Sequence, residues 1–386
     1  LKIEDKLLGD IAFQLGLAYK KRRKPKKALL HFEISVKNAE TIKNDTILIE
    51  RLTETSNTHH ILGNTSGALD ILKHRQDLII TLYGKETTQN SDNLLQLSSL
   101  YSKMNDFDSA IASNKASTTI LQSIHGSSSV KLASNLTQLG QIYGNLGNYD
   151  EAIKLQDKAL SLFTNADKTN KDYVLALFIK AWLLEKINEN KLAIQLYKEV
   201  QEILKDQPNH PGYIAANGNI GLASTNVGDY ETALTYIQKA LKKTSPKNLA
   251  RYTTRMQNLA FLYTKLGDFK KAEKIYTKAK NNLKDHKNSN LILCGRLINN
   301  IGKMHRLKGD IKASEPLFKE ALEVFLQVHD KNHIQYGYQH NDYANMLFNL
   351  KRYEEALELF IENISLSKIN NRINTQEHQN WLFNLG

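Results

Sequence analysis

An alanine that returns about every 40 residues constrains the fold of this chain more than any other feature. It occurs as Ala28, Ala68, Ala110, Ala152, Ala193, Ala233, Ala272 and Ala356, with Ser314 in the eighth place. Flanking residues recur in register with it along almost all of the 386 residues. A fixed period of this size indicates a solenoid, because each unit buries its apolar face only by stacking on the next unit.

Each repeat predicts two helices that pack closely. We number every repeat so that this alanine is position 20. Large apolar residues occupy positions 4 and 7, a small residue position 8 and often an aromatic residue position 11, as in Leu136, Leu139, Gly140 and Tyr143. These positions share one face of a helix. Small residues at positions 8 and 20 would let the second helix approach the first.

A turn is predicted at position 15, between the two helices. Glycine occupies this position in several repeats, as at Gly147, Gly228, Gly267 and Gly309. We expect a left-handed backbone there, since glycine adopts it most easily. An aromatic residue two positions later, such as Tyr149, is expected to begin the second helix and to pack back onto the first.

Some repeats depart from the pattern. In the second repeat, positions 7, 8 and 11 carry Thr55, Ser56 and His59. Lys180 occupies position 7 of the fifth repeat, and the ninth repeat has His340 and Tyr343 where aliphatic residues are usual.

The pattern resembles the tetratricopeptide repeat. The period exceeds the usual length of about 34 residues, and we expect the extra residues to lengthen the helices. Arrays of the kinesin light chain type are similar, as are those attached to bacterial CHAT domains, which are caspase-like. The stretches at Tyr83-Gly84 and His125-Gly126 resemble the linker of that subclass. The resemblance implies an all-α fold, a right-handed α-solenoid of antiparallel helix pairs that forms a tetratricopeptide superhelix.

We predict a single solenoid over residues 1–386, with about nine repeats and the first helix of a tenth. The repeats are expected near residues 9–48, 49–90, 91–132, 133–173, 174–213, 214–252, 253–294, 295–336 and 337–378, with a partial repeat at 379–386. The closing segment NWLFNLG matches a first helix at Leu382, Leu385 and Gly386. Half a helix cannot bury its apolar face, so we expect the native protein to continue.

Composition narrows the function classes. The 5 prolines favour helices, which an interior proline would break. Cys294 is the single cysteine, which excludes an intrachain disulfide and suits a reducing compartment, so we predict a cytoplasmic location. No apolar run approaches the length of a membrane span.

The net charge of +12 is concentrated in part in KKRRKPKK, residues 20–27. Such a cluster could bind nucleic acid or serve as a nuclear address. No aromatic residue interleaves with it and no nucleic-acid motif follows. A solvated basic turn is the simpler interpretation, so nucleic acid is not the expected partner.

In tetratricopeptide solenoids the first helices line a concave surface, to which position 6 would contribute one residue per repeat. These residues are mainly amides: Gln14, Glu54, Gln96, Gln138, Ile179, Asn219, Asn258, Asn300, Asp342 and Asn384. An amide offers a donor and an acceptor, so the column could hold an extended peptide backbone of any sequence. Alternatively, the amides bond to neighbouring helices and hold the pitch of the superhelix.

Selectivity would come from the other inward positions, 2, 5, 9, 12 and 13, which carry cations and aromatic rings. Beyond the residues named below, they include Lys103, Lys186, Phe178, Tyr338 and Phe348. Together they predict an acidic protein or peptide segment with an aromatic or aliphatic anchor. A solvated face with helix-packing aromatics is the alternative. The candidate binding residues are Gln96, Gln138, Asn219, Asn258, Asn300, Asp342, Lys265, Arg296, Lys303, Arg306, Trp182 and Phe261.

No residue set predicts catalysis, a cofactor, a metal or a small-molecule substrate. His329 and His333 have helical ligand spacing, but they lack the intervening glutamate and a third ligand. Cys294 and His305 lie about 16 Å apart along a helix, too far for a dyad. The pair Glu354-Glu355 falls on an expected exposed face.

Two functions from different classes follow. The first is a non-catalytic interaction module that binds a peptide or protein segment on its concave face. The second is the sensing or regulatory arm of a larger effector, such as a CHAT-type cysteine protease or a sensor kinase, with the catalytic domain outside this chain.

Overall fold

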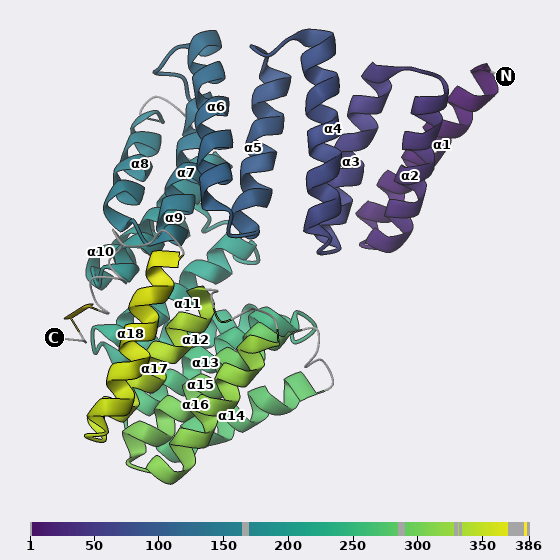
Figure 1. The fold of residues 1–386 in the computed structure, drawn as a ribbon. Coiled ribbons are helices and arrows are strands. Elements are labelled where there is room, and N and C mark those ends of the chain that lie inside the picture. Colours follow the sequence, from purple (N-terminus) through teal and green to yellow (C-terminus); the bar gives the residue numbers. More distant parts are fainter. Residues whose placement is uncertain are drawn as a thin grey trace. The chain divides into compact units, whose positions relative to one another are not determined.

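The computed structural model describes residues 2–163, 170–284, 290–327, 331, 334–369 and 382–383, and within them it contains helices and short connections but no strand. The first helices of the repeats are α1 (Lys2–Lys21), α3 (Asp45–Ile61), α5 (Thr88–Lys103), α7 (Lys131–Leu146), α9 (Lys171–Lys186), α11 (Pro211–Asn226), α13 (Leu249–Lys265), α15 (Leu291–Lys308) and α17 (Ile334–Asn349). The second helices are α2 (Pro25–Thr41), α4 (Thr65–Tyr83), α6 (Phe107–His125), α8 (Tyr149–Ser161), α10 (Asn190–Ile203), α12 (Tyr230–Lys243), α14 (Phe269–Leu283), α16 (Ile311–Leu326) and α18 (Tyr353–Ile369). Successive helices run in opposite directions, which is plainest for α1–α6 in Figure 1. The all-α architecture of helix pairs is therefore confirmed.

The first helices begin a few residues before the predicted repeat starts. Helix α3 begins at Asp45 rather than at residue 49, and α11 begins at Pro211 rather than at residue 214. The preceding residues cap these helices: the Asn44 side chain accepts a hydrogen bond from the Ile47 amide at 3.0 Å, and His210 accepts one from the Gly212 amide at 3.1 Å. A cap satisfies an amide that has no partner within the helix. The extra length of the repeat thus lies in the helices, as predicted.

The turn at position 15 has a left-handed backbone in each of the nine helix pairs of the described chain. Glycine provides it at Gly63, Gly147, Gly228, Gly267 and Gly309, and other residues provide it at Arg23, Asn105, Asn188 and Lys351. The same register of helix and turn imposes the conformation whether or not glycine is present. The glycines therefore identified a position that the whole array shares.

Positions 8 and 20 meet where the two helices of a repeat cross. A Cβ added to Gly16 would lie 2.5 Å from the Phe32 ring, so the glycine is needed for the approach. In the second repeat the Ser56 hydroxyl donates to the Ala68 carbonyl at 3.1 Å. In the eighth repeat the roles are exchanged, and Ser314 donates to the Gly302 carbonyl at 2.9 Å. A serine at either position therefore stays satisfied at a close crossing.

The polar residues at core positions have partners of their own. Lys180 forms an ion pair with Asp157 at 2.5 Å. The Tyr343 hydroxyl donates to Glu315 at 3.1 Å, and buried His340 lies 3.2 Å from the Asn363 side-chain oxygen. These repeats keep their helices because the polar atoms bond inside the interface.

The chain divides into two compact units. The first comprises Leu1–Ile142 and Lys158–Ala166, with Phe32 and Leu72 in its core. The second comprises Tyr143–Asp157 and Asp167–Gly386, with Tyr197, Tyr276 and Phe318 among its buried residues.

A continuous solenoid over residues 1–386 remains a prediction. The predicted partial repeat at 379–386 lies outside the described residues, apart from Leu382 and Phe383. Among the helices of the described ranges, none combines the length and apolar character needed to cross a membrane.

Candidate functional site

A cavity of about 680 Å³ opens on the first helices of the second unit. Helix α15 contributes the most residues to it, so we call it the α15 cavity. Its lining comprises Gly144, Asn145, Tyr149, Trp182, Lys186, Gln257, Arg296, Asn299, Asn300, Lys303, Tyr338, Gln339 and Asp342. These residues come from helices α7, α8, α9, α13, α15 and α17.

Hydrogen bonds between successive first helices build one wall of the α15 cavity. The Asn300 amide donates to Gln257 at 3.0 Å, and the Asn299 amide donates to Asp342 at 2.7 Å. Both bonds join position 6 of one repeat to position 5 of the repeat before it. In the first unit, Gln138 bonds in the same register to the Leu95 carbonyl at 3.1 Å. At these places the position 6 side chains hold neighbouring repeats together, which was the structural interpretation of the column.

Other amide atoms of the cavity lining remain without a partner. Within the described chain, Gln257 Nε2, Asn299 Oδ1 and Gln339 Oε1 are buried and make no hydrogen bond. A buried amide atom that has lost water without gaining a partner costs about 1–3 kcal/mol. These atoms are one donor and two acceptors, which is what the backbone of an extended peptide can satisfy.

The cations of the α15 cavity differ in how they are held. Lys303 forms an ion pair with Asp342 at 2.6 Å, so its charge is largely balanced. Lys186 lies over the Trp182 ring, 5.8 Å from its centroid. Arg296 is exposed to solvent, yet the surrounding walls desolvate it enough to lower its pKa. One carboxylate faces three cations in this lining, so the cavity attracts negative charge.

The aromatic part of the cavity depends on a small residue. Trp182 is half-buried, and a Cβ added to Gly144 would lie 2.8 Å from its ring. The glycine therefore leaves the space that the indole occupies. A partly exposed indole beside a lysine is a suitable contact for an apolar anchor.

The structure gathers some of the predicted binding residues and separates the others. Trp182, Arg296, Asn300, Lys303 and Asp342 line the α15 cavity. Residues outside its lining are Gln96 and Gln138 in the first unit, and Asn219, Asn258, Phe261, Lys265 and Arg306 in the second.

Several of the predicted residues outside the lining contact other side chains. Asn219 lies beside the Tyr197 hydroxyl. Lys265 lies over the Phe261 ring, 5.5 Å from its centroid. Their role in binding remains a prediction.

Sequence reasoning missed the three amides of the cavity that carry an unpartnered buried atom. Gln257 and Asn299 occupy position 5, which was expected to face inward but was not examined for amides. Gln339 occupies position 3, which was not expected to face inward at all. Reading position 5 as a second amide column would have found the first two.

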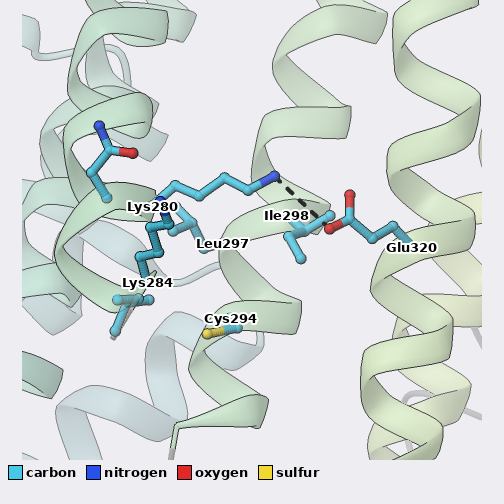
Figure 2. Close-up of a pocket in the computed structure, with 8 residues that line it drawn as sticks. Lys280, Lys284, Cys294, Leu297, Ile298 and Glu320 are labelled. Atoms are coloured by element: carbon cyan, nitrogen blue, oxygen red, sulfur yellow. Dashed lines mark ion pairs between the residues drawn. The ribbon is translucent and has the colours of Figure 1, made fainter. Parts of the chain in front are cut away.

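Among the residues weighed for chemistry, those that the structure describes do not form a second site. His329 and His333 lie outside the described residues. Buried Cys294 borders a cavity of about 340 Å³ that a Lys280–Glu320 ion pair spans at 3.8 Å (Figure 2). Within the described ranges, no three histidine, cysteine or acidic residues group closely enough to hold a metal ion.

The basic cluster at residues 20–27 joins α1 to α2 and is mostly exposed. Lys20 forms an ion pair with Glu54 at 2.6 Å. Lys27 lies over the Tyr19 ring, 5.7 Å from its centroid. This arrangement is typical of a solvated basic turn.

Sequence comparison identifies the family. Two profiles described as "Tetratricopeptide repeat" match the chain, one at residues 131–206 and 293–368, the other at 214–242 and 254–281. The chain belongs to the tetratricopeptide repeat family. No curated protein matches the sequence.

Solved structures share the fold at low sequence identity. The apo quorum sensor NprR of B. thuringiensis superposes with a TM-score of 0.59 at 14% identity, covering 95% of this chain and 99% of that one. A Rap protein complexed with competence and sporulation factor gives 0.57 at 17% identity, covering 96% and 100%. A protein of kinesin light chain TPR-like repeats from Podosopora anserina gives 0.44 at 14% identity, covering 50% and 94%.

Proposed function

We propose that this chain is an interaction module that binds a peptide or an extended protein segment in the α15 cavity, without catalysing a reaction on it. The observation that carries the proposal is the set of buried amide atoms of Gln257, Asn299 and Gln339 that lack partners. An extended backbone would supply the missing donor and acceptors.

The remaining lining favours an acidic segment with an apolar anchor. Arg296 and Lys186 would attract the acidic residues and speed association, because complementary charge steers encounter. Trp182 would contact the anchor. Desolvated aromatic and arginine contacts carry most of the energy of an interface.

Two of the solved structures support a regulatory use of this fold. One is a quorum sensor, and the other was crystallised with competence and sporulation factor. Their identity to this chain shows the fold alone, so the proposed partner class rests on the α15 cavity.

A random library of short peptides displayed on phage tests the proposal. The full chain is expected to select acidic peptides that contain an aromatic or large aliphatic residue. Arg296→Glu should weaken binding of the selected peptides by about tenfold or more, because it replaces a cation of the cavity lining with a carboxylate. Titration of the purified peptides by fluorescence anisotropy measures the change.

Lys308→Glu is the matched control, since it makes the same charge change at an exposed site on α15 outside the cavity lining. It should leave the affinity nearly unchanged. Arg306→Glu tests the wider sequence prediction, because Arg306 also lies outside the lining. Failure to select any peptide, or equal binding by the Arg296→Glu variant, would contradict the proposal.

A regulatory arm of a larger effector is the second candidate. This candidate uses the same site, because the α15 cavity would bind the partner that the effector senses. The association with a CHAT-type protease or a sensor kinase remains a prediction from the resemblance, as does a cytoplasmic location.

A further inference from the structure

A second cavity of the second unit, of about 540 Å³, lies where α9, α11 and α13 begin and α12 ends. One part of its lining is apolar and includes Leu175, Phe178 and Ile214. Another part carries the cations Arg251 and Arg255, among others, and no carboxylate belongs to the described lining. We call it the Arg255 pocket.

Arg255 is the unusual member of this lining. Its side chain is buried, with 9% of the residue exposed, and its Nε has no hydrogen-bond partner among the described residues. Burial, together with nearby Arg251, lowers its pKa. A buried charge without a partner is strongly unfavourable, so such a group is expected to meet a counter-ion from outside.

The repeats contain an internal comparison for Arg255. Arg51 occupies the same position 3 in the second repeat, is equally buried, and pairs with Asp10 at 2.5 Å. Its guanidinium also lies over the Phe13 ring, 4.1 Å from the centroid. Asp10 and Phe13 are positions 2 and 5 of the preceding repeat. Arg51 therefore has its counter-ion within the chain, although its Nε, like that of Arg255, makes no hydrogen bond.

The corresponding residues before Arg255 are both reduced in size. Position 2 of the preceding repeat is Ala215 and position 5 is Gly218. A Cβ added to Gly218 would collide with the Arg255 guanidinium, so the glycine makes the space in which that group lies. The acid and the ring are therefore both missing at this register: the guanidinium occupies the space of the ring, and Ala215 borders the cavity.

We infer that the Arg255 pocket binds a carboxylate carried on an apolar group. The guanidinium would hold the carboxylate with two parallel hydrogen bonds, and Leu175 and Phe178 would cover the apolar group. A phosphate dianion fits less well, because charged oxygens would face the apolar wall. This inference rests on the proposed function for the peptide nature of the ligand, and small probes test the pocket directly.

Two parts of a peptide could supply this chemistry. One is the C-terminal carboxylate of a peptide that ends in a large apolar residue. The other is an acidic side chain beside an apolar residue within a peptide. The first probe is N-acetyl-Phe-Leu with a free C-terminal carboxylate. The same dipeptide with a C-terminal amide lacks the anion and is its neutral counterpart. The second probe is N-acetyl-Glu-Leu amide, which carries a side-chain carboxylate alone.

Ligand-observed NMR with the full chain measures binding of each probe. A probe that carries a carboxylate should bind more tightly than the neutral amide, by about tenfold or more. Preference for the free acid assigns the terminal carboxylate, and preference for the glutamyl probe assigns the side chain. Equal binding of the charged and neutral probes overturns the inference, as does binding of inorganic phosphate but of neither carboxylate.

Two variants test Arg255 itself. Arg255→Met removes the charge, and Ala215→Asp supplies the internal counter-ion that Asp10 provides to Arg51. Both should abolish probe binding and raise the thermal midpoint of the free chain, because the uncompensated charge is gone or paired. Arg22→Met, at an exposed arginine of the α1–α2 turn, is the control and should change neither. Unchanged probe affinity in the Ala215→Asp variant contradicts the inference.

The two proposals fail separately. Selected peptides that bind normally while the small probes do not bind would overturn the Arg255 pocket alone. Probes that bind through Arg255 while no library peptide is selected would overturn the α15 cavity alone.

Discussion

Glu185 shows what a single residue contributes to the interface between α9 and α10. The Tyr197 hydroxyl donates to its carboxyl group at 3.1 Å, and burial raises the pKa of Glu185 to about 7. Asn219 of α11 also lies beside this hydroxyl. The charged form of Glu185 is disfavoured because the surrounding helices exclude water.

This pKa shift predicts a pH dependence of stability. Between about pH 4.5 and 7 the folded chain keeps a proton on Glu185 that the unfolded chain has released, so stability falls as pH rises through this window. Glu185→Gln keeps an acceptor for Tyr197 without the charge. At pH 8 the variant should be more stable than the wild type by on the order of 2 kcal/mol, and near pH 4 the difference should vanish.

Urea unfolding followed by circular dichroism at the two pH values measures this difference. Burial lowers the pKa of His340, whose titration therefore acts in the opposite direction on stability. Comparing the variant with the wild type cancels that contribution. A parallel loss of stability in both proteins would show that Glu185 does not cause it.

At the scale of the element, the crossing of two helices sets the allowed size at position 8. A Cβ on Gly221 would overlap with the Ile237 side chain and lie 3.1 Å from the Ala233 carbonyl oxygen. A Cβ on Gly302 would meet Leu317 at 3.4 Å, which is ordinary contact. The same motif residue is therefore obligatory in one repeat and replaceable in another.

The pair gives a matched prediction. Gly221→Ala should destabilise the chain by about 1–3 kcal/mol, because backbone atoms of α12 cannot move aside easily. Gly302→Ala should be neutral or should stabilise by up to about 1 kcal/mol, since alanine favours the helix. Thermal unfolding of the two variants checks this. Equal effects would mean that the crossing distances do not control position 8.

At the scale of the molecule, the extensive helix contacts join elements that follow one another, with α11–α13 and α13–α15 as additional pairs. In such an array the stability of a segment depends mainly on its neighbours. Damage to a core residue should therefore remain local. The division into two compact units also favours a local effect.

Hydrogen exchange followed by mass spectrometry tests this locality. Phe32→Ala removes a fully buried ring from the first unit and should reduce amide protection in α1–α4 with little change in α13–α16. Phe318→Ala is the counterpart in the second unit and should affect α15–α18 instead. Loss of protection throughout the chain in either variant would show that it unfolds as one cooperative unit.

Much of the fold was predictable from sequence because the determining interactions are local and repeated. Gly147 and Gly309 located the turn, although Arg23 and Lys351 adopt the same backbone without any signal of their own. The helices extend further toward their N-termini than the motif indicated. The cause is a cap, as at Asn44, which the apolar periodicity does not detect.

The sequence by itself determined the helix pairs, their turns and the column of amides, because a period of about 40 residues fixes all three by local physics. Tertiary structure decided which of those amides are free to bind. Asn300 is bonded to Gln257, while one atom of Gln257 remains unpaired. It also decided that Arg255 lacks a counter-ion while Arg51 has one. The cause lies in the preceding repeat, which provides Asp10 to Arg51 but only Ala215 to Arg255. Only the packing of successive repeats brings each arginine next to that position.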